Sequence, residues 1–365
     1  ALLSCFLILI VAICGILVAP YRNDTTALRK VQLPSPLSLY KRPAACYNGD
    51  NIAPFPAKGV LPLEIYLDNA ATTKPCPQAV AAMTAALTEN WGNPSAVHHR
   101  GLQAEQAVKE ARQQVADALG CAPDRIFFTS GGTEGDNFSL FSVAQRLGKR
   151  GRHIITTQVE HHAVLHPAAA LEAQGFSVTY LPPQPDGSIS KKDLAAALRQ
   201  DTILVSVMMV NNETGAVNDI AAMARLVHQK SQAIFHTDAV QGFLKVPFRA
   251  SSLGADLITV SAHKIGGPKG CGAVYVDKSL HLPPFIYGGG QEKNMRSGTE
   301  NVPGIVGFGA ACAAHTRDLR GRLREMAALR DRCITQLQAL VPEAVLIGAH
   351  RAPHILCLGV PGLRS

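Results

Sequence analysis

The pattern of apolar and polar positions changes near Glu64 of this 365-residue chain. Residues 1–19 are almost wholly apolar, and residues 20–63 are rich in proline and polar side chains with no clear period. From Glu64 onward, short apolar runs alternate with longer segments whose apolar residues recur at helical spacing. Alternating strands and helices predict an α/β fold, with a mainly parallel sheet that helices cover on both faces.

The strand candidates are short apolar runs bounded by turn-forming residues. They are Arg125–Thr129, His153–Thr157, Ser177–Leu181, Thr202–Met209, Ala233–Thr237, Leu257–Ser261 and Gly272–Val276. Helical patterns lie between most of them, such as Gln103–Leu119 and Leu194–Arg199. A last helical pattern, Ala314–Leu340, is rich in arginine and is expected outside the sheet. Ligands of such sheets bind at the carboxyl ends of the strands, so the residues after each run are the candidates for a functional site.

The length of the chain favours one large and one smaller domain, preceded by two segments of different character. Residues 1–19 form an apolar leader, long enough for a short membrane span or the apolar part of a signal sequence. Basic residues follow this leader, so a membrane anchor with its basic flank in the cytoplasm is one interpretation. An artefact at the gene start and sequence foreign to the rest of the protein stay open beside it. Residues 20–63 are expected to be a poorly ordered linker.

Charge and cysteine content narrow the classes of function. The net charge is +8, about half of the excess lies between Pro20 and Leu63, and no basic run is interleaved with aromatic residues. This pattern favours an anionic small ligand over nucleic acid. The nine cysteines include no C-x-x-C pair and no metal-type spacing, which indicates reduced thiols in a reducing compartment such as the cytoplasm.

A glycine-rich segment, Ser130–Gly135, follows the run Arg125–Thr129 and leads into a helical pattern. Its consecutive glycines, Gly131 and Gly132, let the backbone approach an anion. The N-terminus of the helix adds free N–H groups and the positive end of the helix dipole. The segment therefore predicts a phosphate site, although glycine-rich turns also simply close strand–helix corners.

Three histidines follow the run His153–Thr157. His161 offers a flat imidazole that can stack on a cofactor ring, and a histidine at a helix terminus is the plainer interpretation. His162 and His166 stand four residues apart, which is the spacing of two zinc ligands on one face of a helix. No third or fourth ligand is evident in the sequence, so a zinc site is the weaker alternative.

Two further runs end in polar residues. Asn211 and Asn212 follow Thr202–Met209 and predict either hydrogen-bonding amides at the edge of the sheet or an ordinary asparagine turn. Asp238 follows Ala233–Thr237, and a carboxylate at the end of an apolar strand is unfavourable without a cationic partner. A protonated pyridine nitrogen is one such partner, and a loop or helix-capping role is the alternative.

A lysine, Lys264, follows the run Leu257–Ser261 within a glycine-rich loop. A lysine whose pKa is lowered by burial is suited to form a Schiff base, whereas Lys269 lies further along the loop and is expected to be exposed. Taken together, the runs supply an anion cradle, a flat ring, an amide, a buried acid and a lysine. These are the parts that a pyridoxal-phosphate site requires.

Longer strings around these residues match one family in order and spacing from about Glu64 to Ser365. They are Tyr66–Thr73, Gly92–Ser95, Thr129–Glu134, Glu160-His161, Val210–Gly215, His236–Gln241, Ser261–Gly267 and Arg296–Thr299. On these strings the chain resembles the cysteine desulfurases, a family of pyridoxal-phosphate enzymes within the class V aminotransferase-like group. The resemblance implies fold type I of the pyridoxal-phosphate-dependent transferases.

The resemblance also implies roles for the cofactor-binding residues. Lys264 would bind the cofactor aldehyde and later move protons, Asp238 would keep the pyridine nitrogen protonated, and His161 would stack on the ring and assist proton transfer. Gln241 would bond the ring hydroxyl. The residues implied to hold the phosphate are Gly132, Thr133, Ser261 and His263.

Two further roles concern the substrate and the partner subunit. Asn212 and Arg364 would bind the substrate carboxylate, Arg364 as a bidentate clamp. Thr299 would reach the phosphate of the neighbouring subunit, which requires a homodimer. The implied reaction transfers sulfur from L-cysteine to a protein thiolate and releases L-alanine. The persulfide would then pass to an acceptor such as an iron–sulfur cluster scaffold or a tRNA-thiolation protein.

The chain departs from the family pattern at its carboxyl end. The family's attacking cysteine lies well beyond the position of Arg364, and none of the nine cysteines occupies the expected place. Cys357 lies in an apolar strand-like run and Cys271 in the loop after the lysine, so both are expected to be structural. We expect a large domain over residues 75–315, and an incomplete small domain formed by residues 64–74 with 316–365.

Other functions stay open at this point. A selenocysteine lyase or an aminotransferase has the same fold, and a hydrolase that uses zinc on His162 and His166 has a different chemistry. A truncated, non-catalytic remnant is the non-enzymatic alternative, with a membrane tether only if the apolar leader is genuine. We expect the 365-residue chain to bind the cofactor poorly and to be unable to complete sulfur transfer.

Overall fold

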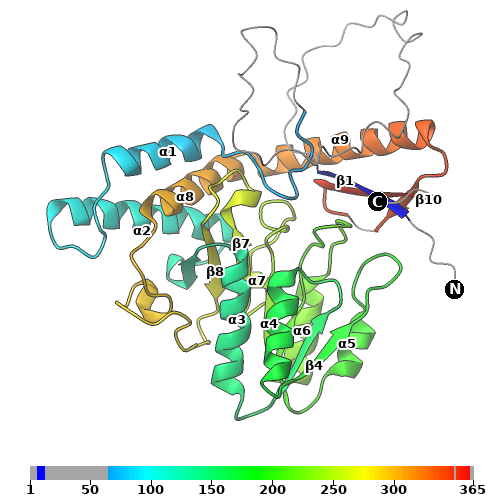
Figure 1. The fold of residues 1–365 in the computed structure, drawn as a ribbon, viewed down its shortest axis with the longest axis horizontal. Helices are drawn as coiled ribbons and strands as arrows, with labels where there is room; N and C mark the ends of the chain where they lie inside the picture. The colour runs from blue at the N-terminus through cyan, green and yellow to red at the C-terminus, as the bar shows by residue number, and fades with distance from the viewer. Residues whose placement is uncertain (1–5, 13–64, 349–350, 362–365) are drawn as a thin grey trace, which may run out of the picture. The chain divides into compact units, whose positions relative to one another are not determined.

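The computed structural model describes residues 6–12, 65–348 and 351–361 (Figure 1). One compact unit comprises Ala1–Cys14 with Leu67–Ser365, and a second comprises Gly15–Tyr66. The expected linker, residues 20–63, and most of the apolar leader lie outside the described residues, so the fold given below is that of the first unit.

A seven-stranded sheet with the order β2-β8-β7-β6-β5-β3-β4 forms the centre of this unit. Its strands are β2 (Ile126–Thr129), β3 (His153–Thr157), β4 (Ser177–Leu181), β5 (Thr202–Ser206), β6 (Ile234–Asp238), β7 (Leu257–Ser261) and β8 (Gly272–Val276). β8 runs antiparallel to both of its neighbours, and the other pairs are parallel. The predicted α/β fold with a mainly parallel sheet is confirmed.

The strands at the centre of the sheet are buried on both faces, and their side chains alternate between two hydrophobic cores. Ile154 and Leu204 contribute to one core, whereas their neighbours Ile155 and Val205 contribute to the other. This alternation follows from the two-residue period of a strand. The two cores explain why these runs are apolar throughout rather than at every second position.

Helices α3 (Gly132–Leu147) and α4 (His162–Ala173) cover one face of the sheet and lie side by side in Figure 1. Their buried side chains, such as Leu140 and Val164, belong to the same core as Ile154. Helix α6 (Ile220–Lys230) packs into the core of the opposite face, to which the helices of the next layer also contribute.

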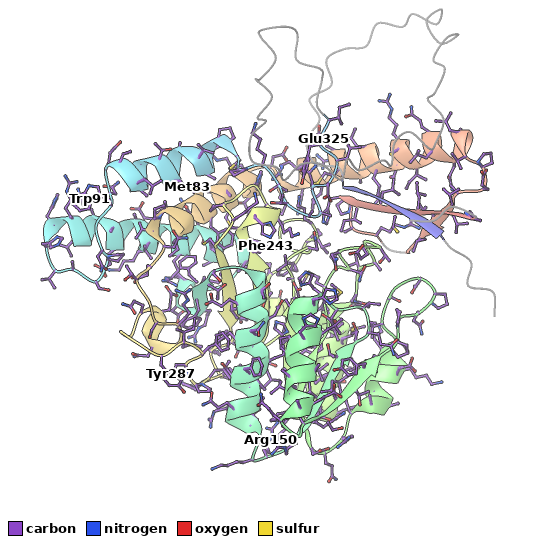
Figure 2. All side chains as sticks on the ribbon, viewed as in Figure 1. Met83, Trp91, Arg150, Phe243, Tyr287 and Glu325 are labelled. Atoms are coloured by element: carbon purple, nitrogen blue, oxygen red, sulfur yellow. The ribbon has the colours of Figure 1, made fainter. Side chains whose placement is uncertain are left out.

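That layer consists of α1 (Pro77–Thr88), α2 (His99–Leu119) and α8 (Val302–Thr316), which pack against one another. Two glycines of α8 make the close approach possible. A Cβ atom at Gly307 would lie 2.6 Å from Cγ of Met83 on α1, and one at Gly309 would lie 2.7 Å from Cα of Ala111 on α2. Figure 2 labels Met83 on this layer, and it labels Phe243, which packs edge-to-face on Phe308 of α8.

A second, three-stranded antiparallel sheet has the order β1-β10-β9. Its strands are β1 (Phe6–Ala12), β9 (Val345–Ile347) and β10 (Ile355–Pro361). Helix α9 (Leu319–Leu340) packs against this sheet, because Leu329 and Cys333 contact the buried Leu356 and Leu358 of β10. The described part of the apolar leader is thus a strand that pairs with β10. Within the ranges that the structure describes, no helix combines the length and the apolarity needed to cross a bilayer.

The expectation of one helix over Ala314–Leu340 is wrong. α8 ends at Thr316 and a new helix, α9, begins after Asp318, whose carboxylate accepts a hydrogen bond from Gly321 N at 3.0 Å. This cap satisfies a free N–H group at the start of α9, so the chain can turn between the two helices. The remaining short helices are α5 (Lys191–Ala197) and α7 (Ala250–Leu253), with 3₁₀ turns at Pro123–Arg125, Ala262–Lys264 and Glu292–Asn294.

Candidate active site

The loops that follow β2, β3, β5, β6 and β7 surround one cavity of about 440 Å³ at the carboxyl edge of the seven-stranded sheet. Parallel strands bring their carboxyl ends to the same edge, so residues far apart in the sequence meet there. The candidate residues that line the cavity are Gly132, Thr133, His161, Asn212, Asp238, Gln241, Ser261, His263 and Lys264.

Two candidates are not among the residues around this cavity. Thr299 is exposed in the segment before α8. Arg364 lies outside the described residues, so its proposed contact with the substrate stays a prediction.

Lys264 ends the 3₁₀ turn that follows β7, and its amine reaches the segment before α1. Its Nζ donates hydrogen bonds to the carbonyl oxygens of Ala70 and Ala71, at 2.5 and 2.8 Å. Burial lowers the pKa of Lys264, and the nearby carboxylates of Asp238 and Asp68 partly offset this shift. The amine is therefore closer to its neutral, nucleophilic form than that of an exposed lysine.

Asp238 is the last residue of β6, and only 6% of its surface is exposed. Its Oδ1 accepts a hydrogen bond from Val240 N at 2.8 Å. Burial raises the pKa of Asp238, while His161 and Lys264 act in the opposite direction. A cation in the cavity next to this carboxylate would restore its charged form, because an opposite charge at close range offsets the penalty of burial.

A second acid, Asp136, lines the same cavity and was missed in the sequence. It lies on α3 with 1% of its surface exposed, and its Oδ1 is 3.5 Å from Nε2 of His236. Neither of its carboxylate oxygens has a hydrogen bond of ordinary geometry to a described residue. Burial and the charge of Asp238 raise the pKa of Asp136 well above its usual value. The available signal was an acid four residues after the second glycine of the cradle, within an otherwise buried stretch of helix.

Glu160 is the third buried acid near this cavity. Its Oε1 accepts hydrogen bonds from Met208 N at 2.8 Å and from Oγ1 of Thr157 at 3.0 Å. Its Oε2 has no partner among the described residues. Burial raises the pKa of Glu160 to about 8, and Asp238 adds to the effect. The residues that line the cavity include more carboxylates than lysines. The site therefore favours a positively charged ligand, or protonation of the buried acids.

His161 is the N-cap residue of α4 and lines the cavity. Its Nδ1 accepts a hydrogen bond from Ala163 N at 3.1 Å, which caps the helix and fixes the plane of the ring. The imidazoles of His162 and His166 stack on each other with centroids 5.0 Å apart. No cluster of three metal-ligating side chains occurs in residues 6–12, 65–348 and 351–361, so the zinc alternative has no third ligand there.

The two asparagines after β5 have different surroundings. The Oδ1 of Asn211 accepts hydrogen bonds from the backbone N–H groups of Glu213 and Thr214, which is an ordinary asparagine turn. Asn212 lines the cavity, and its Nδ2 donates to Glu213 at 2.9 Å. The turn built by Asn211 thus places Asn212 at the site.

The predicted anion cradle lies at one end of the cavity. An adjoining open hollow of about 520 Å³ is lined by Gly132, Thr133, Ser261, His263 and Lys269. Helix α3 begins at Gly132, so its unpaired N–H groups face this region. Burial, with help from the charges of Lys264 and Lys269, lowers the pKa of His263 to about 4, so this imidazole is neutral near pH 7.

Glycines determine the height of the cradle above the sheet. A Cβ at Gly132 would lie 2.7 Å from Cγ2 of Val240. A Cβ at Gly272, in β8, would lie 2.8 Å from Cα of Gly131 and 2.7 Å from the carbonyl oxygen of Val260. The loop therefore lies directly on the backbone of β8, with no space for a side chain between them.

The cysteines of the described residues do not line this cavity. Cys357, on β10, and Cys271 are each 1% exposed, which confirms that both are buried. Burial raises the pKa of the Cys271 thiol to about 12, and that of Cys357 is raised for the same reason. Neither has the properties of a reactive thiolate.

Comparison with known proteins places this arrangement in a family. The sequence profile described as "Aminotransferase class-V" matches residues 65–365. The chain therefore belongs to the class V aminotransferase family, and its relatives within that family are cysteine desulfurases. "Cysteine desulfurase IscS" of Methanosarcina thermophila is 46% identical over 284 residues, which cover 78% of this chain and 70% of the relative. The protein of the same name from Dictyoglomus turgidum is 43% identical over 293 residues, or 80% of this chain and 74% of that one.

Solved structures agree with this assignment. A "NifS-like protein" superposes with a TM-score of 0.79 at 38% sequence identity and covers 81% of each chain. DndA from Streptomyces lividans superposes with a TM-score of 0.71 at 36% identity, covering 80% of this chain and 84% of the other.

Proposed function

We propose that this protein is a pyridoxal-5′-phosphate-dependent cysteine desulfurase, which takes the sulfur of L-cysteine and releases L-alanine. The observation that carries the proposal is the meeting of Lys264, Asp238 and the glycine cradle around one cavity. Around the cavity lie an anion site, a buried acid with no ion pair to a described residue, and an amine. These features fit an aromatic aldehyde with a phosphate arm and a basic ring nitrogen.

The residues that would hold this cofactor follow from their positions. Asp238 would keep the ring nitrogen protonated, His161 would lie against the ring, and Gln241 would contact the ring hydroxyl. Gly132, Thr133, Ser261 and His263 would bind the phosphate. When bound, the cofactor supplies an electron sink that stabilises negative charge at the substrate α-carbon.

The chain's own groups would position the substrate and move its protons. Asn212 would bind the carboxylate of L-cysteine, with Arg364 as the second and cationic contact. The Nζ atom of Lys264 would accept the α-proton, because its lowered pKa leaves a larger neutral fraction than that of an ordinary lysine. Ala70 and Ala71 would hold the amine in place through their carbonyl oxygens.

The sulfur transfer itself needs a thiolate. A thiolate attacks the sulfur of the substrate, an S–S bond forms, the Cβ–S bond breaks, and Cβ gains a proton to give alanine. The balance is one cysteine and one thiol to one alanine and one persulfide. Since no described cysteine lines the cavity, the proposed thiol comes from a part of the protein outside the described residues or from an acceptor.

The test is an assay of the purified protein with pyridoxal phosphate in excess, L-cysteine and an added dithiol, which supplies the attacking thiolate that the chain by itself is expected to lack. We expect one alanine for each sulfide released by the dithiol, and no dependence on a keto acid. Alanine formation from L-selenocysteine alone would favour the lyase alternative. Amino transfer from L-cysteine to a keto acid would contradict the proposal, and so would a protein that takes up no cofactor at all.

The partners of the proposed enzyme are a second copy of the chain and a sulfur acceptor such as an iron–sulfur scaffold or a tRNA-thiolation protein. Thr299 of one subunit would complete the phosphate site of the other, which is consistent with its exposure and with the open side of the cradle. Mixed dimers test this idea. In a mixed dimer of one Lys264→Ala subunit and one Thr299→Ala subunit, one site should keep both its own Lys264 and the Thr299 of the other subunit, a combination that neither homodimer has.

A further inference from the structure

Gln241, which lines the cavity, has a hydrogen-bond partner from the three-stranded sheet region. His354, in the turn before β10, is 3% exposed and its Nε2 lies 3.3 Å from Oε1 of Gln241. The Nε2 of Gln241 donates to the carbonyl oxygen of Ala70 at 2.9 Å. Both ends of the Gln241 carboxamide are therefore held by groups that do not belong to any ligand.

The Ala70 carbonyl determines which way the carboxamide faces. A carbonyl oxygen only accepts hydrogen bonds, so the NH₂ group of Gln241 must face it. The carboxamide oxygen must then face His354. Because that oxygen also only accepts, the proton of the imidazole must be on Nε2.

The surroundings of His354 agree with a neutral imidazole. Burial lowers the pKa of His354 well below its usual value, and the charges of Lys245 and Lys264 add to this. A neutral ring carries one N–H group. Because Nδ1 has no partner among the described residues, the proton can reside on Nε2 and be donated to Gln241. The ring is thus a donor to Gln241, and it cannot act as an acceptor from it.

The consequence concerns what Gln241 can offer to the cavity. Its oxygen is turned toward His354, and one hydrogen of its NH₂ group is engaged by Ala70. The second hydrogen of the NH₂ group is what remains for a ligand. We propose that His354 is a positioning residue that fixes Gln241 as a hydrogen-bond donor, so that the site selects the cofactor with a deprotonated, negatively charged ring oxygen. This inference rests on the proposed function, since the ring oxygen is that of pyridoxal phosphate.

The proposal predicts a change in the titration of bound cofactor. A donor stabilises negative charge on the ring oxygen, so loss of its fixed orientation raises the proton affinity of the bound chromophore. In a His354→Phe variant, we expect the pH midpoint of the visible absorbance change to rise by about one unit. His354→Asn keeps an N–H donor and should bring the midpoint back toward that of the wild type.

Two controls separate this effect from general damage. His281 is exposed and is not among the residues that line the cavity, so His281→Phe should leave the midpoint unchanged. In a Gln241→Leu background, His354→Phe should produce no further shift, because its effect passes through the carboxamide. A His354→Phe protein that binds cofactor with an unshifted midpoint would overturn the proposal, and so would an equal shift in the Gln241→Leu background.

A measurement on the unmutated protein covers the case in which His354→Phe fails to fold. Nitrogen-15 NMR of histidine-labelled, cofactor-loaded protein should show His354 neutral with its proton on Nε2 near pH 7. A proton on Nδ1, or a doubly protonated ring, would refute the role of His354 while leaving the proposed function intact. Wild-type protein without any cofactor absorbance would instead refute the proposed function.

Discussion

The two edges of the seven-stranded sheet differ in how completely their polar and charged side chains are hydrogen-bonded. At the amino edge, His153 is fully buried, but both ring nitrogens have hydroxyl partners, Thr202 at 2.7 Å and Thr179 at 2.9 Å. Arg199 binds both carboxylate oxygens of Asp201 at 2.9 Å. Polar groups at this edge are paired, as expected where their role is to stabilise the fold.

At the carboxyl edge the acids are buried and incompletely paired. Asp136 has no ordinary hydrogen bond to a described residue, and Glu160 has one unpartnered oxygen. Such groups lower stability unless a ligand compensates for them. The comparison teaches that the site can be located by the incomplete pairing of its polar groups as well as by its residue types. The predictions below use one edge as the control for the other.

The largest expected effect is the loss of activity in Lys264→Ala, by at least about 10³-fold. Lys264 lies at the carboxyl edge, and among the described residues that line the cavity it is the only lysine. Lys230, exposed at the end of α6 near the amino edge, provides the matched control. Lys230→Ala should leave alanine formation within about twofold of the wild type, since surface substitutions have small effects. Similar activity in the two variants would remove Lys264 from the chemistry.

A Glu160→Gln substitution should change the pH dependence of stability in the cofactor-free protein. The pKa of Glu160 is raised from 4.5 to about 8, so its contribution to stability is complete below pH 4.5 and is lost as the pH rises through 8. Denaturant unfolding of the wild type should therefore show a decline of a few kcal/mol, roughly, between these pH values. The variant should lose part of this decline, and Asp136 and Asp238 should account for the rest. An unchanged decline in Glu160→Gln would contradict the assignment.

Gly132→Ala should weaken cofactor binding by roughly 10–100-fold, because its Cβ would lie 2.7 Å from Val240 and overpacking costs about 1–3 kcal/mol. Gly151, just before β3, is the matched glycine of the amino edge, where a Cβ would meet the carbonyl oxygen of Asp201. Gly151→Ala should lower the melting temperature while the affinity of the folded protein for the cofactor is kept. Titration of cofactor absorbance and thermal unfolding measure the two effects separately. Equal loss of affinity in both variants would show that the cradle has no special role.

The smallest effect belongs to the amino edge. His228 Nε2 lies 2.9 Å from Oδ2 of Asp256, and this hydrogen bond raises the pKa of His228. Its contribution is therefore present below pH 6.5 and is lost as the pH rises through the raised value. The side chain is 39% exposed, so His228→Asn should lower the free energy of unfolding at pH 6 by less than about 1 kcal/mol and have no effect at pH 9. A larger loss at pH 9 would point to packing instead of charge.

Much of the central sheet could be predicted from the sequence, because strands buried on both faces are short continuous apolar runs. Four of these strands have the predicted bounds, among them His153–Thr157 and Leu257–Ser261. The convergence of Asp238 and Lys264 followed from the rule that ligands bind at the carboxyl ends of strands. The reversed direction of β8 could not be predicted, because apolar runs carry no sign of strand direction.

Other features depended on contacts between distant parts of the chain. The pairing of β1 with β10 joins residues more than 340 positions apart, as in Phe6 and Pro361, and no local pattern encodes it. Asp136 was missed because a single acid near a helix start is ordinarily a cap or a solvent-exposed group. His354 was missed because its partner, Gln241, is known only from the fold.

The close packing of Gly131 on Gly272 predicts which positions outside the cavity will tolerate substitution poorly. Gly272 does not line the cavity, yet its lack of a side chain allows the glycine cradle to lie directly on β8. In a saturation screen, a residue of this kind would score like a catalytic one. Sensitivity to substitution in β8 would then reflect the packing of that strand beneath the cradle, not a role in chemistry. Substitutions in β8 would be the first choice for enlarging the cradle.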